Sequence, residues 1–270
     1  MYLITGALGR IGTIIRNRNE ELFNADVFDI RLDADQNILN DEMLHLTLNT
    51  QEYKAVIHLA ELGQPHLGED IRRQDIFRTN TQGTKNIIDL IRRLQTRLIY
   101  TVDLNKGYGD YARAKRINEM RVLNQAEKSI LLPLPETLPA VETSTPAAFF
   151  DLLRKFAREE NGVYTLLRDP GDIIYLGTET MISDVFNEIL KGLDEHPGGR
   201  IDNSHVFAIK AQNFVEMLRL HFPETTINLV DRKTGETETN EEKGVEQLAA
   251  YFASLPFSAL YLVSTASEIQ

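Results

Sequence analysis

Short apolar runs alternate with amphipathic segments along the first half of the chain. Two segments between these runs, Ile11–Arg16 and Thr84–Leu94, carry apolar residues at helical spacing. Strands that alternate with helices predict parallel βαβ units, in which a buried sheet is covered on both faces. The runs that have the length and apolar content of such strands are Tyr2–Thr5, Ala25–Ile30, Ala55–Ala60 and Arg97–Val102.

The second half of the chain has a less regular pattern. Four prolines within 132–146 predict extended or looped chain, and the apolar side chains of Ala147–Glu160 predict a helix. Asp231–Gly244 is polar and acidic, which is typical of an exposed loop. Val245–Val263 is apolar again and predicts a terminal helix and strand that dock on the body or on a second subunit.

A glycine-rich turn follows the first predicted strand. Gly6, Gly9 and Gly12 form a G-x-x-G-x-x-G run that opens the next helix, and Arg10 and Ile11 lie inside it. Glycines let the backbone turn tightly and approach a pyrophosphate, whose charge is attracted by the free N–H groups of a helix N-terminus. These five residues are therefore predicted to bind a dinucleotide.

An acidic residue, Asp29, ends the second predicted strand, seventeen residues past Gly12. A carboxylate at this place accepts hydrogen bonds from the adenosine ribose hydroxyls, which favours NAD. Arg31 follows two residues later, and Arg is the residue type that binds the 2′-phosphate of NADP. The pair predicts NAD as the cofactor and leaves NADP open.

Tyr111 and Lys115 lie four residues apart in a segment that favours helix, so both side chains share one helical face. A phenol with a pKa near 10 is a poor acid–base at neutral pH. A neighbouring ammonium and an oxidised nicotinamide both stabilise the phenolate and lower that pKa. Tyr111 is thus a candidate general acid–base, and Lys115 is its partner and a donor to the nicotinamide ribose.

Together these features resemble the short-chain dehydrogenase/reductase superfamily, in its extended, NAD-dependent epimerase/dehydratase branch. The resemblance covers residues 1–225, and the spacing after Tyr111 is closest to the dTDP-4-dehydrorhamnose reductase subgroup. It implies that Leu59, Ala60 and Asn80 also line the cofactor. The matching segments are Thr5–Gly12, Val56–Ala60, Asn80–Asn86, the Tyr111, Lys115 and Glu119 set, and Met181–Val185, which in the family begins a helix of the substrate domain.

The resemblance implies a doubly wound parallel Rossmann sheet with a small C-terminal α/β substrate domain. Residues 1–135 are expected to form the NAD(P)-binding domain, and 136–270 mainly the substrate-binding region, with some segments returning to the sheet. The implied activity is that of an NAD(P)-dependent oxidoreductase or epimerase acting on a hydroxyl or keto carbon of a nucleotide sugar or sugar. Many relatives pair through a bundle that includes the Tyr–Lys helix, so a homodimer is expected.

The strand before the Tyr–Lys helix departs from the family pattern. Relatives carry a Ser or Thr at its end, which orients the substrate oxygen. Here Thr101 is the only hydroxyl, although Val102 or Asp103 could fill the same position. The Thr-Asp-Glu triplet of the dehydratases is absent, which argues against that activity. The altered segment also supports an alternative, a non-catalytic dinucleotide-binding regulatory or scaffold protein of the same fold.

Composition and charge exclude several other classes. The chain has no cysteine, which rules out disulfides and thiolate chemistry and makes the cytoplasm the expected location. With 40 acidic and 29 basic residues the net charge is -11, which argues against general nucleic-acid binding. No apolar run approaches the roughly 18 residues of a membrane span. The six histidines show no ligand spacing, so no metal site is expected.

Overall fold

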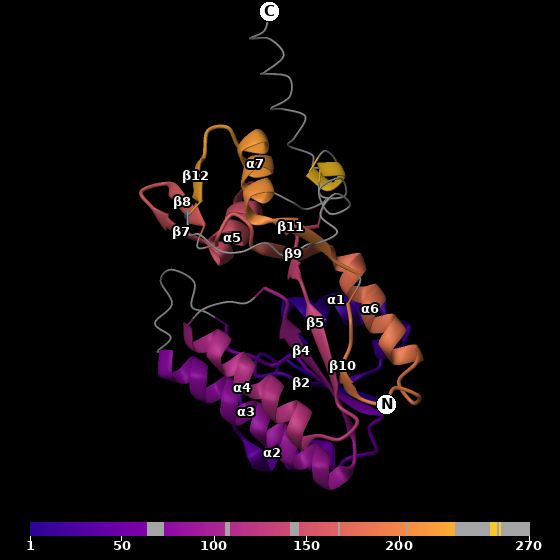
Figure 1. The fold of residues 1–270 in the computed structure, drawn as a ribbon. Helices are drawn as coiled ribbons and strands as arrows, with labels where there is room; N and C mark the ends of the chain where they lie inside the picture. The colour runs from indigo at the N-terminus through magenta and orange to yellow at the C-terminus, as the bar shows by residue number, and fades with distance from the viewer. Residues whose placement is uncertain are drawn as a thin grey trace, which may run out of the picture. The chain divides into compact units, whose positions relative to one another are not determined.

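The computed structural model describes residues 1–63, 73–105, 109–140, 146–166, 168–203, 205–229, 249–252 and 254. The chain divides into two compact units (Figure 1). The first unit comprises Met1–Leu134 and Thr180–Ser204, and the second comprises Pro135–Glu179 and His205–Gln270.

A parallel sheet of six strands forms the centre of the first unit, in the order β10-β5-β4-β3-β1-β2. The chain runs outward from β1 in both directions, so the topological switch lies between β1 and β3, where Thr5 pairs with His58. The predicted doubly wound parallel sheet is thereby confirmed. The strands are β1 (Tyr2–Thr5), β2 (Asp26–Phe28), β3 (Ala55–His58), β4 (Arg97–Asp103), β5 (Ile130–Leu134) and β10 (Gly199–Arg200).

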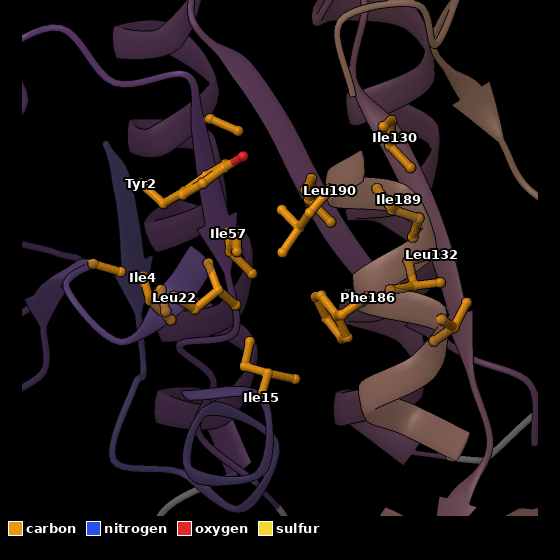
Figure 2. Packing of buried hydrophobic residues seen from close by; sticks show 14 of the residues in the cluster. Tyr2, Ile4, Ile15, Leu22, Ile57, Ile130, Leu132, Phe186, Ile189 and Leu190 are labelled. Atoms are coloured by element: carbon orange, nitrogen blue, oxygen red, sulfur yellow. The ribbon is translucent and has the colours of Figure 1, made fainter. Parts of the chain in front are cut away.

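Helices cover both faces of this sheet. On one face, α1 (Arg10–Arg18) and α6 (Glu179–Lys191) pack against the strands, with a short 3-10 helix, η1 (Glu20–Leu22), beside them. Figure 2 shows this layer, in which Phe186 and Leu190 of α6 face Ile57 of β3. The other face carries α2 (Asp41–Leu48), α3 (Arg73–Leu94) and α4 (Gly109–Gln125), which lie side by side (Figure 1).

Two small sheets, the helices α5 and α7 and the helical residues 249–252 make up the described part of the second unit. Phe149 is at the centre of its aromatic core, with ring centroids 5.3 Å from Phe252 and 5.9 Å from Phe222. One sheet has the order β11-β9-β6 and the other β12-β8-β7. The elements are β6 (Glu136–Thr137), α5 (Pro146–Phe156), β7 (Ala157–Glu160), β8 (Val163–Leu166), β9 (Ile173–Gly177), β11 (Phe207–Lys210), α7 (Ala211–His221) and β12 (Thr226–Leu229).

The helix predicted over Ala147–Glu160 is wrong in its last turn. Helix α5 ends at Phe156, and β7 then pairs antiparallel with β8. The cause is the turn between them, where Asn161 and Gly162 have φ of 53° and 77°. An Asn-Gly pair with positive φ at both residues makes a two-residue hairpin, and the pairing across it overrides the helical preference of the preceding residues.

Other predictions meet the structure differently. Met181–Val185 does form a helix, α6, but this helix packs on the parallel sheet of the first unit and not in a substrate domain. The predicted acidic loop Asp231–Gly244 lies outside the described residues, as does most of Val245–Val263. Within that last segment, residues 249–252 are helical, and Phe252 is buried against Phe149.

Candidate active site

The glycine turn brings three parts of the first unit into close contact. Gly6 has a φ of 70°, and a Cβ there would lie 2.6 Å from the Cα of Ala60. A Cβ on Gly12 would lie 2.5 Å from the carbonyl oxygen of Ala7. Only glycine therefore lets the turn after β1 rest on the chain after β3 and lets α1 pack on the turn. This places the predicted residues Leu59 and Ala60 beside the turn.

The N-terminus of α1 has the features of an anion-binding site. The helix begins at Arg10, its N-cap is Gly9, and no side chain caps it. The first turn holds no acidic residue, so the N–H groups of Arg10, Ile11 and Gly12 and the helix dipole favour a negatively charged ligand. A Cβ on Gly9 would lie 3.0 Å from the carbonyl oxygen of Gly6. The absence of a side chain at Gly9 therefore leaves the backbone of the turn open to a ligand. These residues fit a pyrophosphate.

Asp29 and Arg31 lie next to this turn. Asp29 is almost fully buried, and its two carboxylate oxygens accept hydrogen bonds from the backbone N–H of Leu8 at 2.8 Å and of Arg31 at 2.9 Å. The side chain of Arg31 is 58% exposed, and its Nε lies 3.4 Å from Asp29. A Cβ on Gly9 would be 3.6 Å from the Arg31 guanidinium. The carboxylate thus shapes the turn, whereas the guanidinium lies beside it and is open to solvent.

A buried polar network connects the strands to α3 and α4. The ring of His58 lies 2.7 Å from the Thr5 hydroxyl and 3.0 Å from the Thr84 hydroxyl. Asn118 donates to that Thr84 oxygen at 3.0 Å and to the carbonyl oxygen of Asn80 at 2.9 Å. Burial, with a smaller effect from the Lys115 charge, lowers the pKa of His58 to about 3, so the ring is neutral. His58 is a structural member of this network.

Asn80, predicted to contact the cofactor, has another role in this structure. Its side chain is buried, accepts from the N–H of Leu62 at 2.8 Å and donates to the carbonyl oxygen of Leu62 at 2.9 Å. These two hydrogen bonds hold the backbone just after Ala60 against α3. They thereby fix the position of Glu61, which lies between Ala60 and Leu62.

Glu61 joins the two residues of the predicted catalytic pair. The hydroxyl of Tyr111 donates to Glu61 Oε2 at 2.6 Å. The ammonium of Lys115 donates to Glu61 Oε1 and, at 2.8 Å, to the carbonyl oxygen of Thr101. The side chain of Glu61 is 17% exposed and that of Lys115 is buried. The structure thus brings Tyr111 and Lys115 together at the carboxyl edge of the sheet, through a carboxylate that the sequence argument did not include.

The carboxylate changes the electrostatics of the pair. Burial, followed by the charges of Glu61 and Asp103, raises the pKa of Tyr111 well above 10. Burial raises the pKa of Glu61, although Lys115 opposes this effect. Burial is the largest effect on Lys115 and lowers its pKa, but Glu61, Tyr100 and Asp103 together outweigh burial and raise that pKa overall. The expected lowering of the Tyr111 pKa by Lys115 is therefore absent. Because both oxygens of Glu61 accept hydrogen bonds, the group consists of a phenol, a carboxylate and an ammonium.

The end of β4 narrows the choice for the substrate-orienting residue. Val102 is buried in the apolar cluster with Val56 and Leu131, on the face covered by α2, α3 and α4. Side chains alternate along a strand, so Thr101 and Asp103 point to the other face. Thr101 is buried and Asp103 is exposed. Val102 is thereby removed from the three candidates, and Thr101 is the only hydroxyl left.

Two contributors were missed by the sequence argument, although each had a signal. Glu61 directly follows a predicted parallel strand, at the edge where such sheets bind ligands. Asn118 lies three residues after Lys115 and shares its helical face. Among the described residues, no three His, Asp or Glu side chains gather in a way that could hold a metal ion. None of the helices in the described part of the chain has the length and apolar character needed to cross a membrane.

Comparisons with known proteins agree with this architecture. A comparison with curated proteins gives no match. Three solved structures have the same fold over nearly the whole chain. They are UDP-glucose 4-epimerase from Brucella ovis in complex with NAD (16% identity, TM-score 0.60, 92% of this chain and 91% of that chain), dTDP-4-dehydrorhamnose reductase from Bacillus anthracis in complex with NADP (16%, 0.59, 93% and 97%), and L-threonine dehydrogenase from Phytophthora infestans (12%, 0.59, 94% and 99%).

At these identities the solved structures show a similarity of fold alone. The family evidence comes from the sequence, because residues 2–120 match the model of the NAD dependent epimerase/dehydratase family. That span contains the glycine turn, Asp29, Glu61 and the Tyr111–Lys115 pair. The resemblance deduced from the motifs is thereby confirmed over residues 2–120, the part of the chain that matches this family model.

Proposed function

We propose that this protein is an NAD(P)-dependent oxidoreductase or epimerase that acts on a hydroxyl or keto carbon of a sugar or nucleotide sugar. The observation that carries the proposal is the contact of Tyr111 and Lys115 with Glu61, at the same carboxyl edge of the sheet as the glycine turn. Acid–base chemistry and a dinucleotide site thus belong to one edge, as hydride transfer requires.

Apart from Asn80, each predicted residue has a part in this activity. Gly6, Gly9 and Gly12 form the pyrophosphate site with the N–H groups of Arg10 and Ile11, and Asp29 and Arg31 face the adenosine end. The backbone of Leu59 and Ala60 borders the cofactor beside Gly6. When bound, the nicotinamide supplies the hydride acceptor or donor. Tyr111 moves the proton at the substrate oxygen, and the Thr101 hydroxyl orients that oxygen. The Lys115 ammonium balances the negative charge of Glu61.

The substrate class is drawn from the relatives of this fold. The Brucella ovis and Bacillus anthracis proteins are a UDP-glucose epimerase and a dTDP-sugar reductase, which supports a nucleotide sugar here. The Phytophthora infestans protein is an L-threonine dehydrogenase, so the same fold also serves amino-acid substrates. A substrate screen therefore includes nucleotide sugars, free sugars and hydroxy amino acids.

Calorimetric titration with NAD and with NADP tests the cofactor site before any substrate is known. We expect binding of at least one of them, and Gly9→Val is expected to abolish it because the side chain fills the bare backbone of the turn. Gly171→Val is the matched control for a glycine substitution, because Gly171 lies in the second unit, has open space around it and does not have a positive φ. Failure of wild type to bind either cofactor at millimolar concentration would refute the proposal.

The rival function is that of a non-catalytic dinucleotide-binding regulatory or scaffold protein. The observation that favours it is the ion pair of the Glu61 carboxylate with the ammonium of Lys115. The substrate screen separates the two functions. Turnover with any member of the panel supports the enzyme, whereas tight NAD binding without turnover on the whole panel supports the rival.

We also propose a cytoplasmic homodimer. The outer face of α3 and α4 exposes the large apolar residues Leu94, Met120 and Leu123, which a two-fold helical interface would bury. Light scattering that gives the monomer mass of 30.7 kDa at micromolar concentration would reject the dimer.

A further inference from the structure

Glu61 is held in place from both sides. Before it, the N–H of Ala60 donates to the Thr5 hydroxyl at 3.3 Å, and after it both backbone polar groups of Leu62 bind the side chain of Asn80. Its two oxygens are divided between two partners, with Oε1 on Lys115 and Oε2 on Tyr111. A carboxylate held this way is a preorganised acceptor for the phenol proton.

The charges around Tyr111 oppose a free phenolate. While Tyr111 is a phenol, Glu61 and Lys115 carry one negative and one positive charge, and the buried group is neutral. Ionising Tyr111 would set two negative charges against one ammonium, and the exposed carboxylate of Asp103 nearby adds to the repulsion. Tyr111 can therefore accept a proton from a substrate only if its own proton leaves at the same time.

We propose that Glu61 is the acceptor of that proton and forms a relay with Tyr111. This inference rests on the proposed function. In the oxidising direction, the proton of the substrate hydroxyl moves to the Tyr111 oxygen, and the proton of Tyr111 moves to Glu61 Oε2. The hydride leaves the same carbinol carbon for the oxidised nicotinamide, so that the C–H and O–H bonds break and a carbonyl forms. Reduction is the same sequence reversed.

The relay assigns separate roles to the three side chains. Tyr111 is the catalytic residue, because it touches the reacting oxygen. Glu61 is a positioning residue that acts through Tyr111, and Lys115 stays an ammonium throughout and keeps Glu61 ionised at rest. An ionised Glu61 is ready to accept, so oxidation is expected to rise with pH across the Glu61 pKa. Reduction needs a protonated Glu61 and is expected to fall across the same pKa.

The first test needs neither cofactor nor substrate. The protein is labelled with ¹³Cζ-tyrosine, and the Tyr111 signal is identified by its loss in Tyr111→Phe. The titratable groups that act on Tyr111 are Glu61, Asp103 and Tyr100, and the Lys115 ammonium lies 5.9 Å from the centre of its ring. In Glu61→Gln the ammonium of Lys115 loses its carboxylate, and we expect the pKa of Tyr111 to fall by roughly one pH unit or more. Asp103→Asn is the matched control, since it removes a nearby but exposed charge, and we expect a smaller fall.

Glu61→Asp is a second variant, which keeps the test valid if Glu61→Gln does not fold. It keeps the charge but shortens the side chain by one methylene, which breaks the hydrogen bond to Tyr111. We expect its Tyr111 pKa to lie between those of wild type and Glu61→Gln, and circular dichroism reports whether each variant is folded. A Tyr111 pKa that is the same in wild type and in the folded Glu61 variants would overturn the relay.

The second test separates the relay from the proposed function. Once a substrate is found, the pH dependence of oxidation is measured for wild type, Glu61→Gln and Asp103→Asn. We expect the acidic limb of the profile to disappear in Glu61→Gln, because the amide cannot accept a proton, and to persist in Asp103→Asn. An unchanged limb in Glu61→Gln would overturn the relay but leave the proposed function intact. Absence of NAD and NADP binding in wild type would instead overturn the proposed function, and the relay with it.

Discussion

Removal of the Arg31 guanidinium should weaken the binding of NADP and leave that of NAD nearly unchanged. The guanidinium lies beside the Gly9 turn, within reach of the adenosine end of a dinucleotide, and it is 58% exposed. Charged hydrogen bonds of Arg to phosphate oxygens are among the stronger polar contacts in proteins. NADP carries a 2′-phosphate at this end and NAD does not, so Arg31→Ala acts on one cofactor only.

The size of the effect follows from what Arg31 contacts. Its ion pair with Asp29 is exposed on the Arg side, with 3.4 Å between Nε and Oδ1, so its loss should change the free energy of unfolding by about 0.5 kcal/mol or less. A charge-assisted hydrogen bond to a bound phosphate contributes about 1.5–3 kcal/mol. Arg31→Ala should therefore raise the dissociation constant of NADP by roughly 10- to 150-fold.

Isothermal titration calorimetry with both cofactors measures this selectivity. Arg93→Ala is the matched control, because it removes the same exposed side chain near the end of α3, just before β4 begins and away from the carboxyl edge of the sheet. Both cofactors should bind that variant as they bind wild type. An equal loss of NAD and NADP affinity in Arg31→Ala, or no loss of NADP affinity, would refute the assignment of Arg31 to the 2′-phosphate.

Three further predictions test the site and the core. Tyr111→Phe should lower turnover by about 10²- to 10⁴-fold, with cofactor affinity by calorimetry nearly unchanged; an unchanged rate would remove Tyr111 from the chemistry. Phe186→Ala leaves a cavity beside Ile57 and should cost about 3–5 kcal/mol of unfolding free energy in urea titrations, so a loss below about 1 kcal/mol would contradict the packing. His58 is neutral in the fold, with a pKa lowered to about 3, but binds a proton below about 6.5 when unfolded. Its contribution is thus present above pH 6.5 and is lost as the pH falls toward 3, amounting to about 2 kcal/mol between pH 7 and pH 5. Urea titrations at these pH values should show that loss in wild type and a smaller one in His58→Gln.

Sequence pattern predicted most strands of the first unit because a buried parallel strand is apolar along most of its length. Tyr2–Thr5 and Ala55–His58 are such strands, and their register follows once they are adjacent. Ala157–Glu160 has the opposite character, since its residues favour helix and its strand state comes from pairing with β8. Gly199–Arg200 is a strand only because it extends the sheet beside β5, and two residues carry no pattern of their own.

The candidate site divides along the same line, between local and distant contacts. Gly6 and Gly12 were predictable because the local backbone requires glycine at both positions. Gly6 has a positive φ, and Gly12 lies close to the backbone of Ala7. The contacts of Glu61 with Tyr111 and Lys115 span 50 and 54 residues and depend on where α4 lies relative to the end of β3. Spacing within one helix showed which residues share a face, but it could not show what faces them.

Protonation is the property for which this difference matters most. A pKa depends on every charge that faces a group, whereas the argument from the Tyr111–Lys115 spacing counted the ammonium and an oxidised nicotinamide and predicted a stabilised phenolate. With Glu61 in contact with both partners, the ammonium is already balanced, and the same tyrosine is a phenol with a raised pKa. A tyrosine in that state can still take part in proton transfer, provided that a second acceptor stands behind it. The position of Glu61, and not the motif, therefore decides the protonation state of the pair.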